Sequence, residues 1–261
     1  MKDAFTYDVA EFSEGSFSET RLTAIQEVPL TIYLNGREIV TLLCTGKHPK
    51  FLAVGFLKSD GLVTDSKQLK TVDVDEEAER LQVSVETSHD PFENQRLGRS
   101  ITSGCGKGTN FERNVETIAS TTVRAELSVT PEQILRLSAE LDERSTLYRA
   151  TGGCHNASLA TPEGILIFCE DIGRHNAIDM ICGECFLEGI PTDDKLIVST
   201  GRIASEILLK TIRLGVPILV SRAAATRFSI DLARRTNMTL IGRARQGQMV
   251  VYNHGGRIAG L

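Results

Sequence analysis

The sequence predicts an α/β protein in which a mixed sheet is flanked by helices, with a smaller β-rich part before it. Throughout the second half of the chain, short apolar runs alternate with helical segments of about 12 residues. The first half instead holds pairs of β-prone runs joined by tight turns. The 261 residues, 41% of them hydrophobic, are enough to bury a core of this kind. We therefore expect a β-rich part over residues 1–125, which includes the Cys105 loop, and an α/β domain over residues 126–261.

Turn signals define the elements of the β-rich part. Asn35-Gly36 separates two β-prone runs and suits a type I′ turn, because both central residues of that turn need positive φ angles. Pro49 suits the first position of a helix that runs to about Lys58, and Gly61 lies just past its end. The other expectations are strands at 28–34, 37–43, 72–74, 81–85 and 120–129, an exposed loop over 88–114, and loose order over residues 1–20.

Capping signals define the elements of the second half. Thr130-Pro131-Glu132-Gln133 combines an N-cap, a proline at the first helical position and a capping-box glutamine, so a helix should begin here. Gly215 is the expected residue just past the end of a later helix. The other expectations are helices over 175–187 and 223–236, a helix that follows the turn at 200–202 and runs to Leu214, and strands at 157–160, 165–169, 195–199, 216–221, 239–242 and 249–252.

The composition argues against several classes of protein. A net charge of −5 and a pI near 5.6 disfavour a nucleic-acid binder, because neutralising phosphates requires an excess of Lys and Arg. No apolar stretch reaches the roughly 18–20 residues that span a bilayer. The first 15 residues lack the basic start and apolar run of a secretory signal. We expect a cytoplasmic protein without membrane contact, whose six cysteines are mostly reduced thiols.

Cys105 is the candidate catalytic residue. Glycines flank it on both sides, and the nearby Lys107 favours the thiolate, which is the reactive form of sulfur. Such a thiolate can take over the outer sulfur of a donor persulfide. The ordinary alternative is a loop cysteine without a role. Cys182 and Cys185 fall on the apolar stripe of a predicted helix, so we interpret them, like Cys154, as packing residues.

Polar clusters lie at the predicted ends of several strands. In α/β sheets, phosphates and nucleotides bind at the carboxyl ends of strands, where helix N-termini face them. Each cluster alone is equally consistent with a capped helix or a tight turn, but consecutive clusters favour one shared pocket. The predicted cofactor-binding residues are Gly152, Gly153, His155, Asp171, Arg174, His175, Asn176, Gly201, Arg202, Ser205, Ser221, Gly242, Arg243, Ala244, Arg245, Gln246, Gly247 and Gln248.

Individual residues in these clusters suggest individual roles. Asp171 could accept hydrogen bonds from a base, and Arg174 could hold a phosphate with its planar fork. His155 or His175 could protonate a leaving thiolate, and the sequence does not choose between them. Together with its neighbours at the strand ends, Arg222 would help to hold a polyphosphate. No second C-x-x-C pair completes a zinc site, so we expect no intrinsic metal.

Several short motifs occur together in one order along residues 26–258. They are Glu27-Val28-Pro29-Leu30, Asn35-Gly36, Gly55-Phe56-Leu57, Asp60-Gly61-Leu62, Ser103-Gly104-Cys105-Gly106, Thr151-Gly152-Gly153 with His155, Glu170 to Ala177, Gly201-Arg202 with Ser205-Glu206, and Gly242 to Arg245. In this combination the chain resembles the formate dehydrogenase accessory sulfurtransferase family, FdhD.

The resemblance implies a larger domain with a cytidine deaminase-like fold but without zinc chemistry. It also implies that Cys105 accepts sulfur from a cysteine desulfurase as a persulfide. The sulfur then passes to the bis-molybdopterin guanine dinucleotide cofactor of formate dehydrogenase, a bound substrate whose guanine nucleotide the polar clusters would surround. A GDP-like ligand is therefore expected to bind. The implied partners are the desulfurase and the catalytic subunit of formate dehydrogenase, and the implied state is a homodimer.

One position departs from the family pattern. The family loop usually carries C-x-x-C, whereas Gly108 takes the second place here, so a resolving thiol in the loop is missing. This keeps open a second hypothesis, a non-catalytic chaperone that binds the molybdenum cofactor and delivers it to apo-formate dehydrogenase. A third, a nucleotide deaminase, is disfavoured because the H-x-E and P-C-x-x-C zinc signatures are absent.

Overall fold

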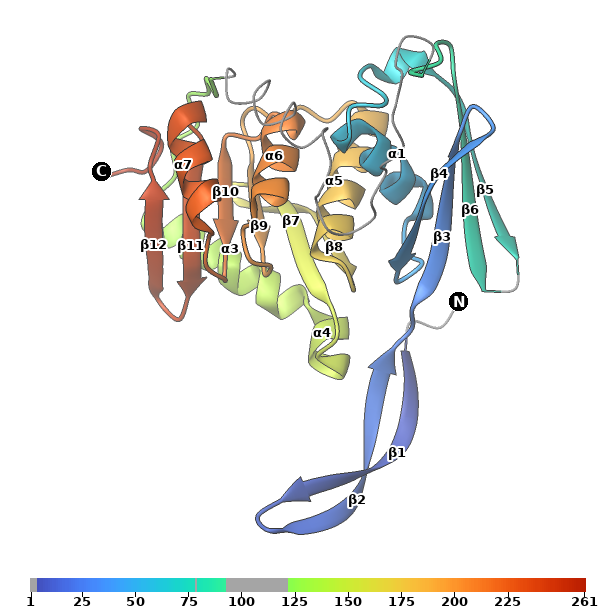
Figure 1. Cartoon of the computed structure of the whole chain (residues 1–261). Helices are drawn as coiled ribbons and strands as arrows, with labels where there is room; N and C mark the ends of the chain where they lie inside the picture. Colours follow the sequence, from blue (N-terminus) through green and yellow to red (C-terminus); the bar gives the residue numbers. More distant parts are fainter. Residues whose placement is uncertain (1–3, 78, 93–121) are drawn as a thin grey trace.

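The computed structural model describes residues 4–77, 79–92 and 122–261. The strands in these ranges form a six-stranded sheet, a four-stranded sheet and a two-stranded arm (Figure 1). Mixed sheets flanked by helices confirm the predicted α/β class. The boundary between residues 125 and 126 and the likeness to cytidine deaminases stay predictions.

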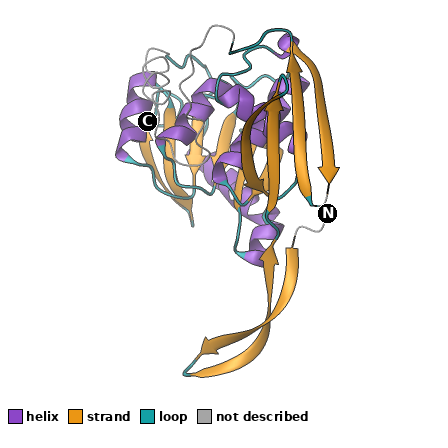
Figure 2. Ribbon diagram, turned by 45° about the vertical axis from the view of Figure 1, so that its right-hand side comes forward, coloured by secondary structure: helices purple, strands orange, loops and turns teal. Residues whose placement is uncertain are grey.

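The first described residues form a projecting hairpin, so the expectation of loose order is wrong for residues 4–20, and residues 1–3 lie outside the described part. Strands β1 (Ala4–Ser13) and β2 (Ser16–Ile25) pair antiparallel along their whole length. The turn between them uses Glu14 and Gly15, both with positive φ. The arm extends beyond the main body in Figures 1 and 2. Its strands were hard to predict because their side chains do not enter the core, so burial imposes no clear alternation.

The four-stranded sheet has the order β4-β3-β6-β5. Asn35 and Gly36 have φ values of 51° and 74°, which confirms the predicted type I′ geometry between β3 and β4. The predicted helix after Pro49 is also confirmed, as α1, and a short 3-10 helix over Ser66–Gln68 leads into β5. The bounds are β3 (Val28–Leu34), β4 (Arg37–Cys44), α1 (Pro49–Ser59), β5 (Leu69–Glu77) and β6 (Arg80–Thr87).

The six-stranded sheet has the order β12-β11-β10-β9-β7-β8, with β9, β10 and β11 parallel. Helix α3, which begins with the predicted Thr130–Gln133 capping box, covers one face, and α5, α6 and α7 cover the other (Figures 1 and 2). No helix in the described part of the chain could cross a membrane. The bounds are α3 (Pro131–Arg144), α4 (Thr146–Thr151), β7 (His155–Thr161), β8 (Gly164–Asp171), α5 (Arg174–Glu188), β9 (Leu196–Ser199), α6 (Ser205–Leu214), β10 (Ile218–Ser221), α7 (Arg227–Thr236), β11 (Thr239–Arg245) and β12 (Gln248–Asn253).

Helices α1 and α5 cross at a pair of glycines. A Cβ on Gly55 would lie 1.7 Å from the Asp179 carbonyl oxygen, and a Cβ on Gly183 would lie 1.9 Å from the Phe51 carbonyl oxygen. The backbones can therefore touch only because neither residue has a side chain. Through this crossing, one hydrophobic core joins the four-stranded sheet to the helices on the six-stranded sheet.

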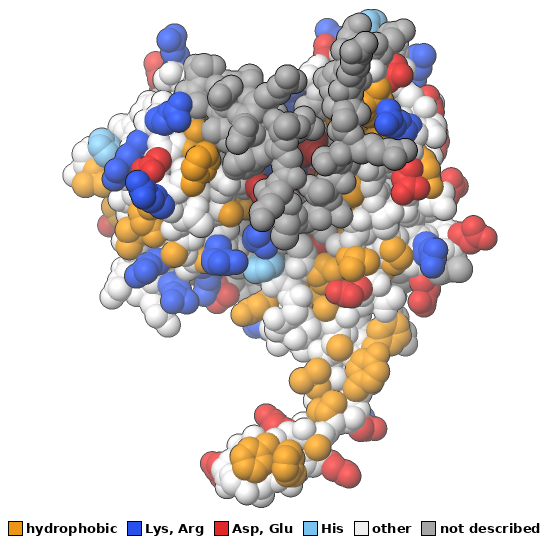
Figure 3. All heavy atoms as spheres, viewed as in Figure 1, with side chains coloured by type: hydrophobic (Ala, Val, Ile, Leu, Met, Phe, Trp, Pro, Cys, Tyr) orange, Lys and Arg blue, Asp and Glu red, His pale blue; other side chains and the backbone are white. Residues whose placement is uncertain are grey.

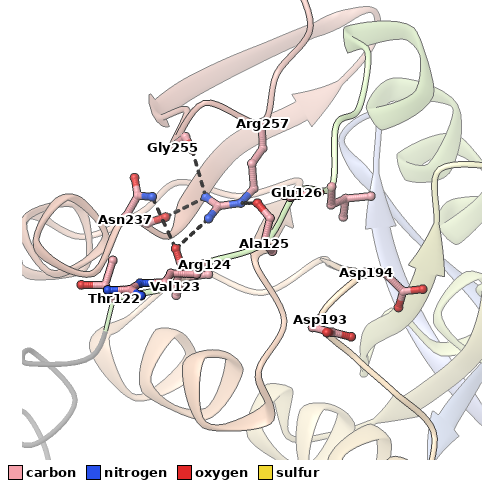
Figure 4. A pocket seen from close by; sticks show the side chains of 11 residues that line it. Thr122, Val123, Arg124, Ala125, Glu126, Asp193, Asp194, Asn237, Gly255 and Arg257 are labelled. Carbon is pink, nitrogen blue, oxygen red and sulfur yellow. Dashed lines mark hydrogen bonds between the residues drawn. The ribbon is translucent and has the colours of Figure 1, made fainter.

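A buried arginine anchors the segment that enters the second half. The Arg257 side chain donates to the carbonyl oxygens of Val123, Asn237 and Gly255, as Figure 4 shows. Residues 122–128 follow an irregular path, and only Val129 bridges to Ile258, so the strand predicted over 120–129 is wrong within the residues described. The hollow in Figure 4 lies just before β9, at the opposite end of the sheet from the predicted cofactor residues.

Candidate functional site at the strand ends

The predicted cofactor-binding residues converge on one edge of the six-stranded sheet. Because β9, β10 and β11 run parallel, their carboxyl ends share this edge. Strand β7 runs antiparallel to β9, and β8 runs antiparallel to β7, so the start of β7 and the end of β8 lie there too. In Figure 1 this is the lower edge of the sheet, on the same side as the arm. The strand order thus brings together the clusters around residues 152–155, 171–176, 201–205, 221 and 242–248.

Gly201 is the point where two of these clusters touch. A Cβ at this position would lie 2.9 Å from Cβ of Arg174, so only glycine lets the arginine side chain lie across the turn. The hydroxyl of Ser221 donates to the Gly201 carbonyl at 2.6 Å, and the hydroxyl of Ser199 accepts from the Gly201 N–H at 3.2 Å. These bonds hold the turn after β9 against β10. Ser205, at the first position of α6, follows directly.

Asp171 is buried and fully engaged with protein donors. One carboxylate oxygen accepts from the backbone N–H and the hydroxyl of Thr45, at 2.8 and 3.0 Å. The other accepts from Gly173 N–H and from the side-chain amide of Asn176. Burial raises the pKa of Asp171, while these hydrogen bonds oppose the rise. Its predicted role as a base acceptor stays untested, and in this structure the carboxylate orders the loops around the site.

Sequence reasoning missed Thr45, which the fold brings to Asp171 from 126 residues away. It also missed α4, where the Leu147 N–H donates to the buried carboxylate of Glu170 at 3.1 Å. Gly152 ends this helix with a φ of 64°, a conformation that favours glycine. This residue therefore caps a helix, which is the ordinary alternative to the predicted anion-binding turn. No local sequence signal could have identified the Thr45 contact.

His175 lies beside Glu206 but is held neutral. Its Nε2 atom is 3.1 Å from a Glu206 carboxylate oxygen, yet the contact lacks hydrogen-bond geometry and Nε2 is buried without a partner. Burial, with the positive charges of Arg174 and Lys210, lowers the pKa of His175 to about 3. Burial and Arg174 also lower the pKa of His155. Nε of Arg174 is likewise buried without a partner, so two polar atoms in this corner have unused hydrogen-bonding capacity.

The predicted arginine cluster divides into two groups. Arg202, Arg243 and Arg245 are exposed along the edge, where Lys and Arg side chains gather in the lower left of Figure 3. By contrast, Arg222 turns toward α3, where it pairs with Asp142 at 3.1 Å. Arg202, Arg243 and Arg245 are therefore accessible to a ligand, whereas Arg222 is already paired with Asp142.

A bulge and a tight turn shape the end of β11. The register between β11 and β12 shifts after Gly242, and Arg243 takes a φ of 53° there. Ala244 is buried, and its carbonyl accepts from the hydroxyl of Ser138 on α3. Gln246 and Gly247 then form the turn into Gln248 with positive φ values, and all three are exposed. Only the exposed members of this group could contact a ligand directly.

The described cysteines are unsuited to nucleophilic chemistry. Burial raises the pKa values of the Cys44, Cys154, Cys169 and Cys185 thiols to about 12 and that of Cys182 to about 11. All five are free and buried, which agrees with the packing role expected for Cys154, Cys182 and Cys185. Cys105, Lys107 and Gly108 lie outside the described residues. Within the described part, no group of three or more His, Cys, Asp or Glu side chains could hold a metal ion.

The fold and the strand ends define a class of protein: an α/β protein with a polar, arginine-bearing edge at the carboxyl ends of its parallel strands. The FdhD/NarQ family profile matches residues 25–259, and the chain belongs to this family. It is 38% identical to the Sulfur carrier protein FdhD of Bacillus subtilis, with 96% of each chain covered. It is 41% identical to the protein of the same name from Halalkalibacterium halodurans, over 87% of this chain and 85% of that protein.

A solved structure shows the same fold. This crystal structure is of a protein from Desulfotalea psychrophila that was assigned as a formate dehydrogenase accessory protein. The two structures superpose with a TM-score of 0.80 at 22% identity, covering 98% of this chain and all of that one. At this identity the likeness establishes the fold alone.

Proposed function

We propose that this chain is a sulfurtransferase that accepts sulfur from a cysteine desulfurase as a persulfide on Cys105. It transfers this sulfur to the bis-molybdopterin guanine dinucleotide cofactor, which formate dehydrogenase requires for activity. Family membership over nearly the whole chain, with relatives named as sulfur carriers, supports the proposal. A cytoplasmic location, a homodimer, and the catalytic subunit of formate dehydrogenase as partner are parts of the same proposal.

The burial and the raised pKa values of the described thiols are the main reason to assign the persulfide to Cys105. Five of the six cysteines are buried with pKa values raised to about 11 or 12, so almost none of them is thiolate near pH 7. That leaves Cys105, with Lys107 two residues away, as the candidate nucleophile. Its thiolate attacks the outer sulfur of the desulfurase persulfide. A new S–S bond forms on Cys105, the donor S–S bond breaks, and the desulfurase cysteine leaves as a thiolate.

The strand-end edge suits the guanine nucleotide part of the proposed substrate. Exposed Arg202, Arg243 and Arg245 offer positive charge to phosphates, and the first turns of α5 and α6 open onto the same edge. Arg174, whose side chain lies against Gly201, has a buried Nε without a hydrogen-bond partner, as does Nε2 of His175. The proposal includes no intrinsic metal, because arginine side chains and helix N-termini can hold the phosphates of the cofactor.

Mass spectrometry tests the persulfide directly. After incubation with a cysteine desulfurase and cysteine, we expect an added mass of about 32 Da, one sulfur atom, on the peptide that contains Cys105. The matched control is Cys154→Ala, which removes a buried thiol and should load as the wild type does. An adduct on any other cysteine, or none at all, would contradict the assignment.

The substitution Cys105→Ala distinguishes the sulfurtransferase from a delivery chaperone, the alternative that stays open because Gly108 replaces the second cysteine of the loop. Loss of the thiol should abolish activation of formate dehydrogenase while guanine nucleotide binding remains. If this variant binds nucleotide and still fully activates the enzyme, the protein acts as a delivery chaperone and the transfer step is wrong. Activation is measured as formate oxidation after co-expression with the dehydrogenase.

A further inference from the structure

Helices α5 and α6 lie side by side on one face of the six-stranded sheet, and both begin at the strand-end edge (Figure 1). Their facing side chains meet at two levels, one helical turn apart. At the first level, Nε2 of His175 lies 3.1 Å from a carboxylate oxygen of Glu206. Asp179 and Lys210, four residues further along each helix, lie on the same faces and meet at the second level. The contact between the helices therefore runs from the edge into the interior of the protein.

The deeper level is a buried ion pair in which both carboxylate oxygens are engaged. Nζ of Lys210 donates to the two oxygens of Asp179 at 2.7 and 2.8 Å, and these side chains are only 12% and 2% exposed. The hydroxyl of Ser59, the last residue of α1, donates to Asp179 at 2.7 Å. Burial opposes a charge on Lys210, but the carboxylates of Asp179 and Asp60 outweigh it, so the pKa of Lys210 is raised. The pair thus fixes α6 on α5 and on the end of α1.

Stability alone gives little reason for an ion pair at this place. Taking two charges out of water is costly, and apolar side chains of similar size often replace a buried pair without loss of stability. An ion pair with two short hydrogen bonds does fix the distance and the direction between two helices, because hydrogen bonds are directional and apolar contacts are not. The position of the pair indicates what this fixed geometry is for.

The turn that enters α6 carries one of the exposed arginines of the edge. Arg202 lies in this turn, three residues before Ser205 begins α6. Directly before it, Gly201 lies against the first residue of α5, so that an added Cβ would be 2.9 Å from Cβ of Arg174. A small shift of α6 along α5 would therefore move Arg202 relative to Arg174. Lys210 is five residues after Ser205, about 8 Å along the helix axis, and so holds this turn from behind.

We propose that Lys210, through its ion pair with Asp179, positions Arg202 for the phosphates of a guanine nucleotide at the strand-end edge. Lys210 does not touch the ligand, because it is buried more than one helical turn behind the edge. Its role is to hold α6 in the one place where Arg202 and Arg174 reach the same ligand together. This inference rests on the proposed function, since it assumes a nucleotide at this edge, but it does not depend on sulfur transfer.

GDP binding to the full-length protein, measured by calorimetry, tests this positioning. The double substitution Asp179→Asn with Lys210→Met removes both charges at once, so that neither is left unpaired in the interior. In the wild-type background we expect it to weaken GDP binding about tenfold. In the Arg202→Ala background it should weaken binding less than about twofold, because the side chain that it positions is already absent. General loosening of the fold would instead weaken binding equally in both backgrounds.

A milder variant and a matched control complete the test. Ser59→Ala removes one hydrogen bond from Asp179 and no charge, so it keeps the test available if the double variant does not fold. It should show a smaller loss with the same dependence on Arg202. Lys195→Met removes a lysine whose side chain is 8% exposed and paired with Asp194 at 2.6 Å, at the end of β9 far from the edge. This control should leave GDP binding unchanged.

The possible failures can be told apart. Equal losses with and without Arg202, or no loss at all, would overturn the positioning role and leave the nucleotide site in place. A wild type that binds no GDP would overturn the nucleotide site, and the positioning role with it. The persulfide result on Cys105 would stand in each of these cases.

Discussion

At the scale of single residues, burial decides the chemistry of this protein more than residue type does. His175 is held neutral by its surroundings, although a carboxylate of Glu206 lies 3.1 Å away. The described cysteines, which look alike in sequence, become inert thiols for the same reason. Desolvation disfavours the charged form of each group, which is imidazolium in one case and thiolate in the other.

His175 should make the fold sensitive to acid. Its folded pKa of about 3 lies below its ordinary value of 6.5, so the unfolded chain binds more protons between these values. Stability contributed by the neutral side chain is therefore present near pH 7 and is lost as pH falls below 6.5. Between pH 7 and 5 we expect the wild type to lose about 2 kcal/mol more unfolding free energy than His175→Gln.

Urea unfolding at several pH values measures this difference. His89→Gln, at an exposed histidine, serves as the control and should follow the wild-type curve. Parallel pH profiles for the wild type and His175→Gln would show that His175 is not held neutral in the folded state.

At the scale of elements, most helices and strands could be predicted because local signals and burial agree. The capping box at Thr130–Gln133 begins α3, as its sequence predicts. Asn35-Gly36 forms the turn between β3 and β4 with the positive φ angles that a type I′ turn requires. The arm and α4 were not predicted, each for its own reason. The arm has no core to impose alternation, and α4 is only six residues long, held by contacts to β2 and Glu170.

The crossing of α1 and α5 should tolerate no side chain. Gly55→Ala would place a Cβ 1.7 Å from the Asp179 carbonyl oxygen, which forces the two helices apart. We expect a loss of about 3 kcal/mol or more in the free energy of unfolding, measured from the urea midpoint. Gly164→Ala is the matched control, because its nearest neighbour would be 3.9 Å away. A stability close to that of the wild type for Gly55→Ala would mean that the helices are not in contact there.

At the scale of the whole molecule, the candidate site exists only because the sheet order collects distant segments. If the exposed arginines of this edge hold a guanine nucleotide, GDP should raise the melting temperature. At a GDP concentration of 100 times Kd the gain is about 2.7 kcal/mol. Arg202→Ala should weaken this shift markedly. Arg234→Ala, at an exposed arginine in the last turn of α7, should keep it. An unchanged melting temperature for the wild type in excess GDP would count against the pocket.

The sequence by itself determined the α/β class, most element boundaries, the family resemblance and the identity of the candidate sulfur carrier. These follow from hydrophobic periodicity, backbone requirements and short motifs, all of which are local. Only the tertiary structure decided that Thr45 donates two hydrogen bonds to Asp171, that Arg222 pairs with Asp142, and that β1 and β2 project as an arm. The physical reason is that hydrogen-bond partners and burial are set by contacts between residues far apart in the chain, which local patterns do not encode.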